Sequence, residues 1–210
     1  MNDDFELKYA ANMFRHLNSG RFVCSNSCSE EERIWFELLD REWERYREAW
    51  KKTTGLVLSR GDQYFFFRRS FNADNLSRKD LEEMYNEAAL VVDLIYSLDQ
   101  SFDVGNNISL TWVLSALDGN TDAQKKCRDI TKFTERNDQA VALIKKLKKM
   151  GIIDIYMDTD KNEERYVVQS AFRYYLSFIE RIQALDPDEE EAVSSGDDTP
   201  GLFDKEIETE

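Results

Sequence analysis

Hydrophobic residues repeat at helical spacing in several stretches of the chain, and two runs of strand-forming residues follow each series of such stretches. Near the start, apolar residues recur every four positions from Phe5 to Leu17 and predict a first helix. Ser29-x-x-Glu32 has the form of a capping box, in which the hydroxyl and the carboxylate satisfy backbone donors reciprocally. We expect one long amphipathic helix from this box to Gly55.

A β-hairpin is predicted after this helix. Residues 56–59 (Leu-Val-Leu-Ser) and 64–69 (Tyr-Phe-Phe-Phe-Arg-Arg) favour strands, and Gly61-Asp62 between them favours a turn. The second run is aromatic on both of its faces, so one face would expose large apolar rings if water covered it. We therefore expect this strand to be buried between two parts of the molecule.

The remainder of the folded chain repeats the order of helices and then a hairpin. Ser77-x-x-Asp80 predicts a helix start, and apolar residues at helical spacing continue to Leu98. Residues 103–107 predict a break in regular structure. The helices expected after this break cover residues 109–117, 121–136 and 138–150.

A second hairpin and a last helix complete the repeat. Residues 153–157 alternate apolar with polar positions, which predicts one strand, and residues 165–168 (Arg-Tyr-Val-Val) complete the hairpin. Ser170 is expected to cap the final helix. Helices followed by a hairpin, occurring twice, indicate an α+β fold that is mainly helical. We predict tandem winged-helix domains at residues 1–75 and 76–185.

The composition changes abruptly at residue 186. Residues 186–210 hold eleven acidic side chains against one lysine, and they contain both prolines of the chain. Most of the net charge of −14 therefore lies in this segment. A segment with so much charge and so few apolar residues is predicted to form a disordered acidic C-terminal tail.

The helix expected at residues 138–150 carries the clearest functional signal. Its apolar residues fall on one face, while Lys145 and Lys149 fall on the opposite face, with Lys146 and Lys148 on the flanks. It directly precedes the second hairpin, which is where a winged helix keeps the helix that contacts DNA. The alternative, a lysine face that is simply solvated, stays open at this point.

The residues before this helix are also basic. Between Lys125 and Lys149 there are nine basic and three acidic residues, a balance of +6 in a strongly acidic chain. Further DNA-contacting candidates in this stretch are Lys125, Lys126 and Arg136. Lysines suit the phosphate backbone, whereas reading guanine edges favours planar arginines. The sequence therefore predicts non-specific contact with DNA.

Other classes of function find little support. One histidine and three cysteines leave no second ligand pair for a zinc site, and no glycine-rich phosphate loop is present. We predict no catalysis, no cofactor and no bound metal. No apolar run reaches the length of a membrane span, and the first residues are acidic, so we expect no membrane contact and no secretion signal.

Several segments in a fixed order resemble one known family. They are Ser19-Gly-Arg-Phe-Val23, Gly55-Leu-Val-Leu58 with the aromatic run at 64–69, residues 144–153 (Ile-Lys-Lys-Leu-Lys-Lys-Met-Gly-Ile-Ile), and Ser170-Ala-Phe-Arg-Tyr174. In this order the chain resembles the MukE/MksE family, the accessory subunits of bacterial condensin-like SMC complexes. The resemblance covers nearly all of residues 5–180.

The resemblance implies partners and a role. Family members are tandem winged-helix homodimers that bind the kleisin subunit and, through it, an SMC ATPase. The positions that match the family's DNA-contacting arginines are Lys145, Lys146, Lys148 and Lys149, which keep the charge but lose the planar geometry. The resemblance implies a cytoplasmic, nucleoid-associated protein that serves chromosome organisation and segregation or plasmid defence.

Two other functions remain open at the level of sequence. A homodimeric winged-helix transcription regulator would need side chains that discriminate bases on the helix at 138–150. A purely structural adaptor would share the fold but make no contact with DNA.

Overall fold

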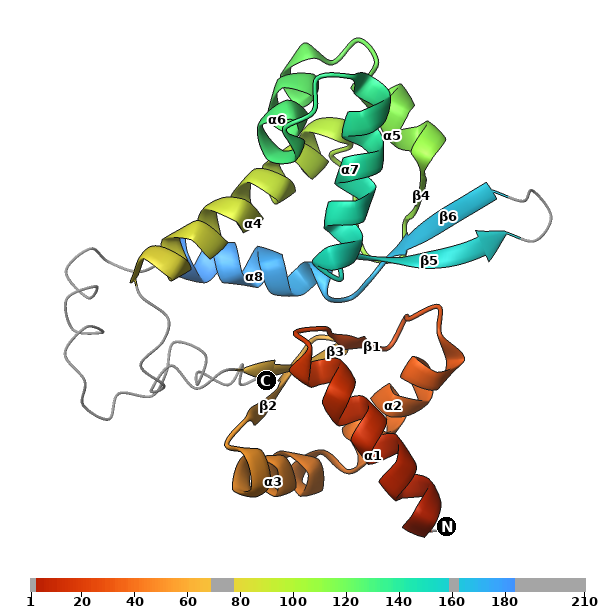
Figure 1. Cartoon of the computed structure of the whole chain (residues 1–210), viewed down its shortest axis with the longest axis vertical. Helices are drawn as coiled ribbons and strands as arrows, with labels where there is room; N and C mark the ends of the chain where they lie inside the picture. The colour runs from red at the N-terminus through yellow and green to blue at the C-terminus, as the bar shows by residue number, and fades with distance from the viewer. Residues whose placement is uncertain (1–2, 69–77, 159–162, 184–210) are drawn as a thin grey trace.

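The computed structural model describes residues 3–68, 78–158 and 163–183, which form a mainly helical α+β fold with two small sheets (Figure 1). The expected cap at Ser77 and the acidic tail at residues 186–210 lie outside the described residues. Within the described part, no helix is long and apolar enough to cross a membrane.

The first part of the chain, here called the N-terminal part, has helices first and a hairpin last. Its elements are α1 Asp3–Asn18, β1 Val23–Cys24, α2 Glu30–Arg41, α3 Trp43–Thr54, β2 Val57–Gly61 and β3 Tyr64–Arg68. The three strands form an antiparallel sheet in the order β1-β3-β2. The strand β1 was not predicted, because two residues are too few to show alternation of apolar and polar positions.

The prediction of one long helix between residues 29 and 55 is wrong, because the chain bends at Glu42. Glu42 has φ −112° and ψ 31°, which ends α2 and begins α3. An unbroken helix of this length would be about 37 Å long, more than a small unit can cover. The bend brings Trp50 of α3 back to the cluster that holds Trp35 of α2.

Two local predictions in the N-terminal part also need correction. The Ser29 hydroxyl accepts the backbone N–H of Glu32, but the Glu32 carboxylate accepts a bond from the Ser27 hydroxyl (2.7 Å) instead of capping Ser29. The hairpin turns at Asp62-Gln63, not at Gly61-Asp62, because Gly61 pairs with Tyr64. Gly61 is needed for the close approach of the Tyr64 ring, which occupies the space of a Cβ atom.

The second part, here called the C-terminal part, repeats the order with more helices. Its elements are α4 Arg78–Leu98, β4 Asn107–Ser109, α5 Leu110–Leu117, α6 Thr121–Thr131, α7 Arg136–Lys149, β5 Ile153–Asp158, β6 Glu163–Val168 and α8 Phe172–Gln183. The strands form an antiparallel sheet in the order β4-β6-β5. Helix α6 ends earlier than predicted, because Lys132 adopts a left-handed conformation with φ 65°.

Each part has its own apolar core. In the N-terminal part, Met13 and Leu17 of α1 pack with Trp35, Leu39 and Phe65. The larger core of the C-terminal part gathers buried residues from every element between α4 and α8, among them Leu94, Val113, Leu117, Leu143, Leu147 and Phe172. Two cores with one sheet each support the reading of two separate structural units.

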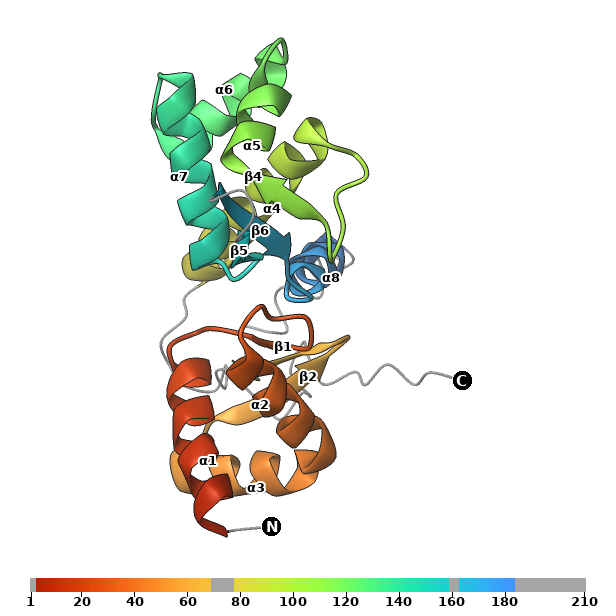
Figure 2. The ribbon, with the colours of Figure 1, turned by 90° about the vertical axis from the view of Figure 1, so that its right-hand side faces the viewer.

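A smaller aromatic cluster joins the two parts, and we call it the junction. Tyr64 and Phe66 of β3 pack with Tyr174 of α8, while Phe65 between them points into the N-terminal core. This alternation confirms the expectation that the aromatic strand is buried on both faces. Figure 2 shows the loop after β1 facing β5, β6 and α8 across the junction.

Polar bonds hold the same junction. Asn26 donates to the carbonyl of Val168 (2.9 Å) and accepts bonds from the backbone N–H (3.0 Å) and hydroxyl (2.8 Å) of Ser170. The Ser170 hydroxyl therefore bonds across the junction, in place of the helix-capping role predicted for it. Asp154 of β5 accepts the backbone N–H of Cys28 (3.0 Å), and Arg173 pairs with Asp62.

Candidate nucleic-acid interface

Helix α7 presents a buried apolar face and an exposed lysine face, as its sequence predicted. Ala140, Leu143, Ile144 and Leu147 are at most 5% exposed and pack in the core of the C-terminal part. Lys145, Lys148 and Lys149 are exposed on the other side. The lysines gather in the last two turns of α7, where positive charge also suits the negative end of the helix dipole.

Lys146 departs from the predicted lysine face. It turns toward α4, forms an ion pair with Glu87, and its side chain is 26% exposed. Burial, and then the nearby Lys149 ammonium, lower the pKa of Lys146. Since its charge is already matched by a carboxylate, Lys146 is not part of the exposed basic surface.

The remaining α7 lysines form a compact basic end. The Lys148 ammonium lies 5.7 Å from the centre of the Tyr166 ring on β6, a cation–π contact that orients the side chain. Within the described parts of the chain, Lys145 and Lys149 take part in no ion pair. We call Lys145, Lys148 and Lys149 the α7 lysine cluster.

The DNA-contacting candidates outside α7 also divide into side chains that pair with a carboxylate and one that does not. Lys126 lies 2.9 Å from both Asp93 and Asp122, and hydrogen bonds to these carboxylates raise its pKa. Arg136 pairs with Asp118. Lys125 is exposed and has no ion pair among the residues that the structure describes. Acids from α4 and from the ends of α5 and α6 therefore cancel much of the local charge of +6. These acids lie outside residues 125–149, to which that charge belongs.

The hairpin beside α7 is acidic. Between Asp154 and Arg165 the sequence holds five carboxylates and two basic side chains. A winged helix that grips DNA with its hairpin would be expected to carry positive charge there. These charges can be read from the sequence, but the position of β6 beside the end of α7 follows from the fold, in which Lys148 contacts Tyr166.

The residues considered for a metal have structural partners instead. His16 bonds to the carbonyl of Phe22 (2.9 Å) and lies 3.7 Å from the Glu32 carboxylate. Burial raises the pKa of the Cys24 thiol to about 12 and that of Cys127 to about 11. Among the described residues, no group of three or more metal-binding side chains comes together.

Comparison with known proteins identifies the class and then the family. A protein-family model, condensin complex protein MksE, matches residues 8–180, so the chain is a component of a condensin-like complex. Because the match covers most of the chain, the chain belongs to the MksE family. The resemblance found in the sequence is thereby confirmed. A search of curated proteins found no match.

Proposed function

We propose that this chain is a non-catalytic subunit of a bacterial SMC complex that binds the kleisin as a homodimer and contacts DNA without sequence preference. The family match supports the condensin-like complex. The DNA contact rests on one observation, the exposed α7 lysine cluster at the end of the helix that precedes the second hairpin. The protein would act at the nucleoid in the cytoplasm.

The order of elements supports two winged-helix domains, at residues 1–75 and 76–185. In the N-terminal part, a helix, a short strand, two helices and a hairpin follow one another, and the short strand pairs with the last one. This is the plan of a winged helix. The C-terminal part has the same plan with one additional helix before its hairpin and a further helix, α8, after it.

The proposed DNA contact is electrostatic. Three lysines at one helix end can neutralise phosphates, but they lack the bidentate geometry that distinguishes guanine from other bases. The acidic hairpin would repel a second strand of phosphates on that side. We therefore place the contact at the end of α7, with Lys125 as a further candidate, and expect modest affinity that falls steeply with salt.

A matched pair of variants tests this contact. Lys148→Glu with Lys149→Glu reverses two lysines in the last turn of α7, and Lys51→Glu with Lys52→Glu reverses two lysines in the last turn of α3. Fluorescence anisotropy of a labelled random duplex reads the affinity of each. We expect about a tenfold loss, and a salt slope smaller by about 2, only for the α7 variant.

The other outcomes point to different functions. Equal affinity of the α7 variant and the unchanged protein would favour a structural adaptor without DNA contact, which the acidic hairpin also favours. Strong preference for one duplex over random DNA would favour a transcription regulator.

The protein partners need a separate experiment. Co-purification from native cells, followed by light scattering, should recover a kleisin, an SMC ATPase and two copies of this chain per kleisin. A bare dimer would contradict the proposal. Deletion of the gene should impair chromosome segregation if the complex organises the chromosome, or lengthen plasmid retention if it serves plasmid defence.

A further inference from the structure

His16, the single histidine of the chain, is held in place near the end of α1 by two neighbours. Its Nε2 lies 2.9 Å from the carbonyl oxygen of Phe22, and its ring packs edge-on against Trp35 of α2, with the ring centres 5.4 Å apart. A carbonyl can only accept a hydrogen bond, so Nε2 carries a hydrogen whether the ring is neutral or charged. In the neutral ring, Nδ1 therefore has a lone pair and no hydrogen.

The Nδ1 atom of His16 faces a carboxylate. It lies 3.7 Å from Oε1 of Glu32 on α2, and the side chains of His16 and Glu32 are 11% and 24% exposed. While the ring is neutral, Nδ1 has no hydrogen for this carboxylate to accept. A proton added at Nδ1 turns the same contact into an ion pair with a charge-assisted hydrogen bond.

Glu32 also competes with a second carboxylate for one hydrogen. The Ser27 hydroxyl oxygen lies 2.7 Å from Oε2 of Glu32 and 3.2 Å from Oδ2 of Asp154. A hydroxyl carries one hydrogen, so it can donate a full hydrogen bond to only one of them. Ser27 lies in the loop after β1 and Asp154 lies on β5, so only the bond to Asp154 crosses the junction (Figure 2).

A second donor reaches the same oxygen of Asp154. The backbone N–H of Cys28 lies 3.0 Å from Oδ2 of Asp154. When the Ser27 hydroxyl turns to Glu32, one bond from this loop holds the Asp154 oxygen, and when the hydroxyl turns to Asp154, two bonds hold it. The partner available to Glu32 therefore sets the number of bonds across this part of the junction.

Three other titratable groups near His16 keep one state around neutral pH. Burial raises the pKa values of Cys24 on β1, of Cys28 in the following loop and of Tyr64 on β3. These two thiols and the phenol are therefore neutral between pH 6 and pH 8, which is the range in which an imidazole ordinarily titrates.

The remaining charged groups around His16 bond to other partners. Arg33 of α2 donates to the backbone carbonyl of Ser27 (2.7 Å). On α1 itself, Arg15 bonds to Asn12, and the amide of Asn12 donates to Glu31 of α2 (3.4 Å). An arginine keeps its charge at any pH near neutrality. The imidazole is therefore the group in this network whose charge changes there.

We propose that His16 is a proton-dependent switch that tightens the junction as pH falls. Uptake of a proton at Nδ1 gives Glu32 a charged partner, and this releases the Ser27 hydroxyl to Asp154 across the junction. The contact between the two parts is then strongest below the pH range in which imidazole titrates and weakest above it. The switch concerns the arrangement of the two parts and is independent of the partners proposed above.

A single histidine makes the test direct in the full chain. The NMR signal of the His16 ring reports its protonation, and amide hydrogen exchange at Cys28, corrected for the intrinsic rate at each pH, reports the bond to Asp154. We expect the protection of this N–H to rise about threefold from pH 8 to pH 6, with the midpoint of the His16 titration. The N–H of Ala123, which bonds to Asn120 outside the junction, should not follow. Constant protection of Cys28, or a His16 ring that does not titrate in this range, would overturn the proposal.

Variants of the network supply the second arm. His16→Gln keeps an N–H for the Phe22 carbonyl but cannot titrate, so the protection of Cys28 should be equal at both pH values. Ser27→Ala removes the shared hydroxyl, so the His16 signal should still titrate while the protection of Cys28 no longer follows it. Ser25→Ala, two positions earlier, is the control and should keep the pH dependence. A pH dependence that persists in either network variant would contradict the switch, and the titration of the unchanged protein tests it even if a variant fails to fold.

Discussion

Asn26 is the residue that ties the two parts of the molecule most directly. Its amide group bonds at once to the Val168 carbonyl and to the N–H and hydroxyl of Ser170, which lie more than 140 positions later in the chain. An amide serves here because it carries both a donor and an acceptor. No helical or strand pattern in the sequence marks such a residue.

Asn26→Ala should lower the free energy of unfolding by about 1–3 kcal/mol, since it leaves the N–H and hydroxyl of the buried Ser170 without their partner. Urea denaturation measures the loss. Asn137→Ala, at an exposed position of α7, is the control and should change stability little. Similar free energies of unfolding for both variants would show that Asn26 does not stabilise the junction.

Cys24 makes the free energy of unfolding depend on pH in the alkaline range. Burial, with added repulsion from Glu32 and Asp154, raises the pKa of its thiol from 9.0 to about 12. Below pH 9 the thiol is neutral in both states, so its contribution is fully present. As pH rises from about 9 toward 12, the unfolded thiol ionises first and stability falls by up to about 1.4 kcal/mol per pH unit. Urea denaturation between pH 8 and 10.5 should show a shallower fall for Cys24→Ala, and parallel curves would contradict this assignment.

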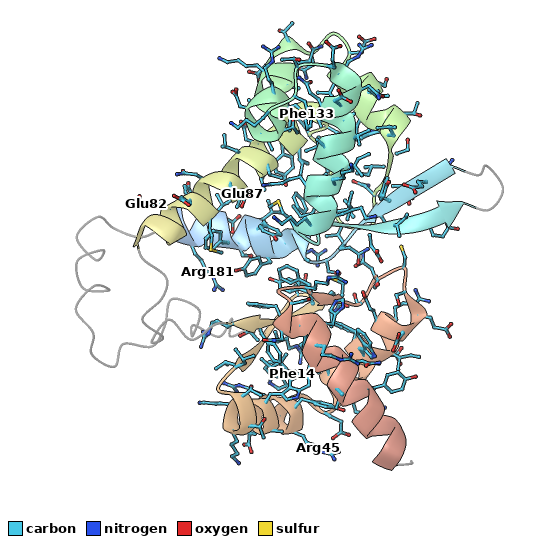
Figure 3. The ribbon with its side chains drawn as sticks, viewed as in Figure 1. Phe14, Arg45, Glu82, Glu87, Phe133 and Arg181 are labelled. Carbon is cyan, nitrogen blue, oxygen red and sulfur yellow. The ribbon has the colours of Figure 1, made fainter. Side chains whose placement is uncertain are left out.

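At the scale of elements, the loop between α6 and α7 shows how one buried side chain shapes a connection. Gln139 is 2% exposed, and its amide donates to the carbonyls of Phe133 (3.0 Å) and Thr134 (3.3 Å). These bonds fix the loop that sets α7 against α6. The exposed side chain of Phe133 lies at the outer end of the C-terminal part (Figure 3).

Gln139→Leu keeps the side chain's size but removes both bonds. We expect a loss of about 1–2 kcal/mol in the free energy of unfolding and faster amide hydrogen exchange at residues 132–135. Gln100→Leu, in an exposed turn, is the control. Unchanged exchange in the α6–α7 loop would show that packing alone holds the loop.

At the scale of the whole molecule, the junction couples two units that each have a core. Tyr174 contacts Phe22, Tyr64 and Phe66 of the N-terminal part. The Arg173–Asp62 ion pair and the bonds of Asp154 lie in the same region. These contacts therefore hold the two parts in one arrangement.

Tyr174→Ala should uncouple the parts. We expect the unchanged protein to unfold in one cooperative transition and the variant in two, with the N-terminal part unfolding separately. Tyr156→Ala removes a tyrosine that is 49% exposed on β5 and should keep the single transition. Differential scanning calorimetry distinguishes these cases, and one transition in the Tyr174 variant would show that the junction does not limit cooperativity.

The sequence alone determined the order of helices and hairpins apart from the break between α2 and α3 and the short strands β1 and β4, the apolar face of α7 with Lys145, Lys148 and Lys149 opposite it, and the family. These properties depend on local periodicity and on residue type, and both can be read directly from the sequence. The sequence did not predict the bend at Glu42, because the apolar stripe of the helix runs through that position without interruption.

Only the tertiary structure decided which charges are available and which surfaces meet. Glu87, Asp93 and Asp118 neutralise Lys146, Lys126 and Arg136, although each pair is separated along the chain by 18 or more residues. A groove beside α4 likewise combines residues of α4 with Ile130 of α6 and Lys146 of α7. Ion pairs and grooves depend on distances in space, and these are set by packing between elements rather than by the pattern within any one of them.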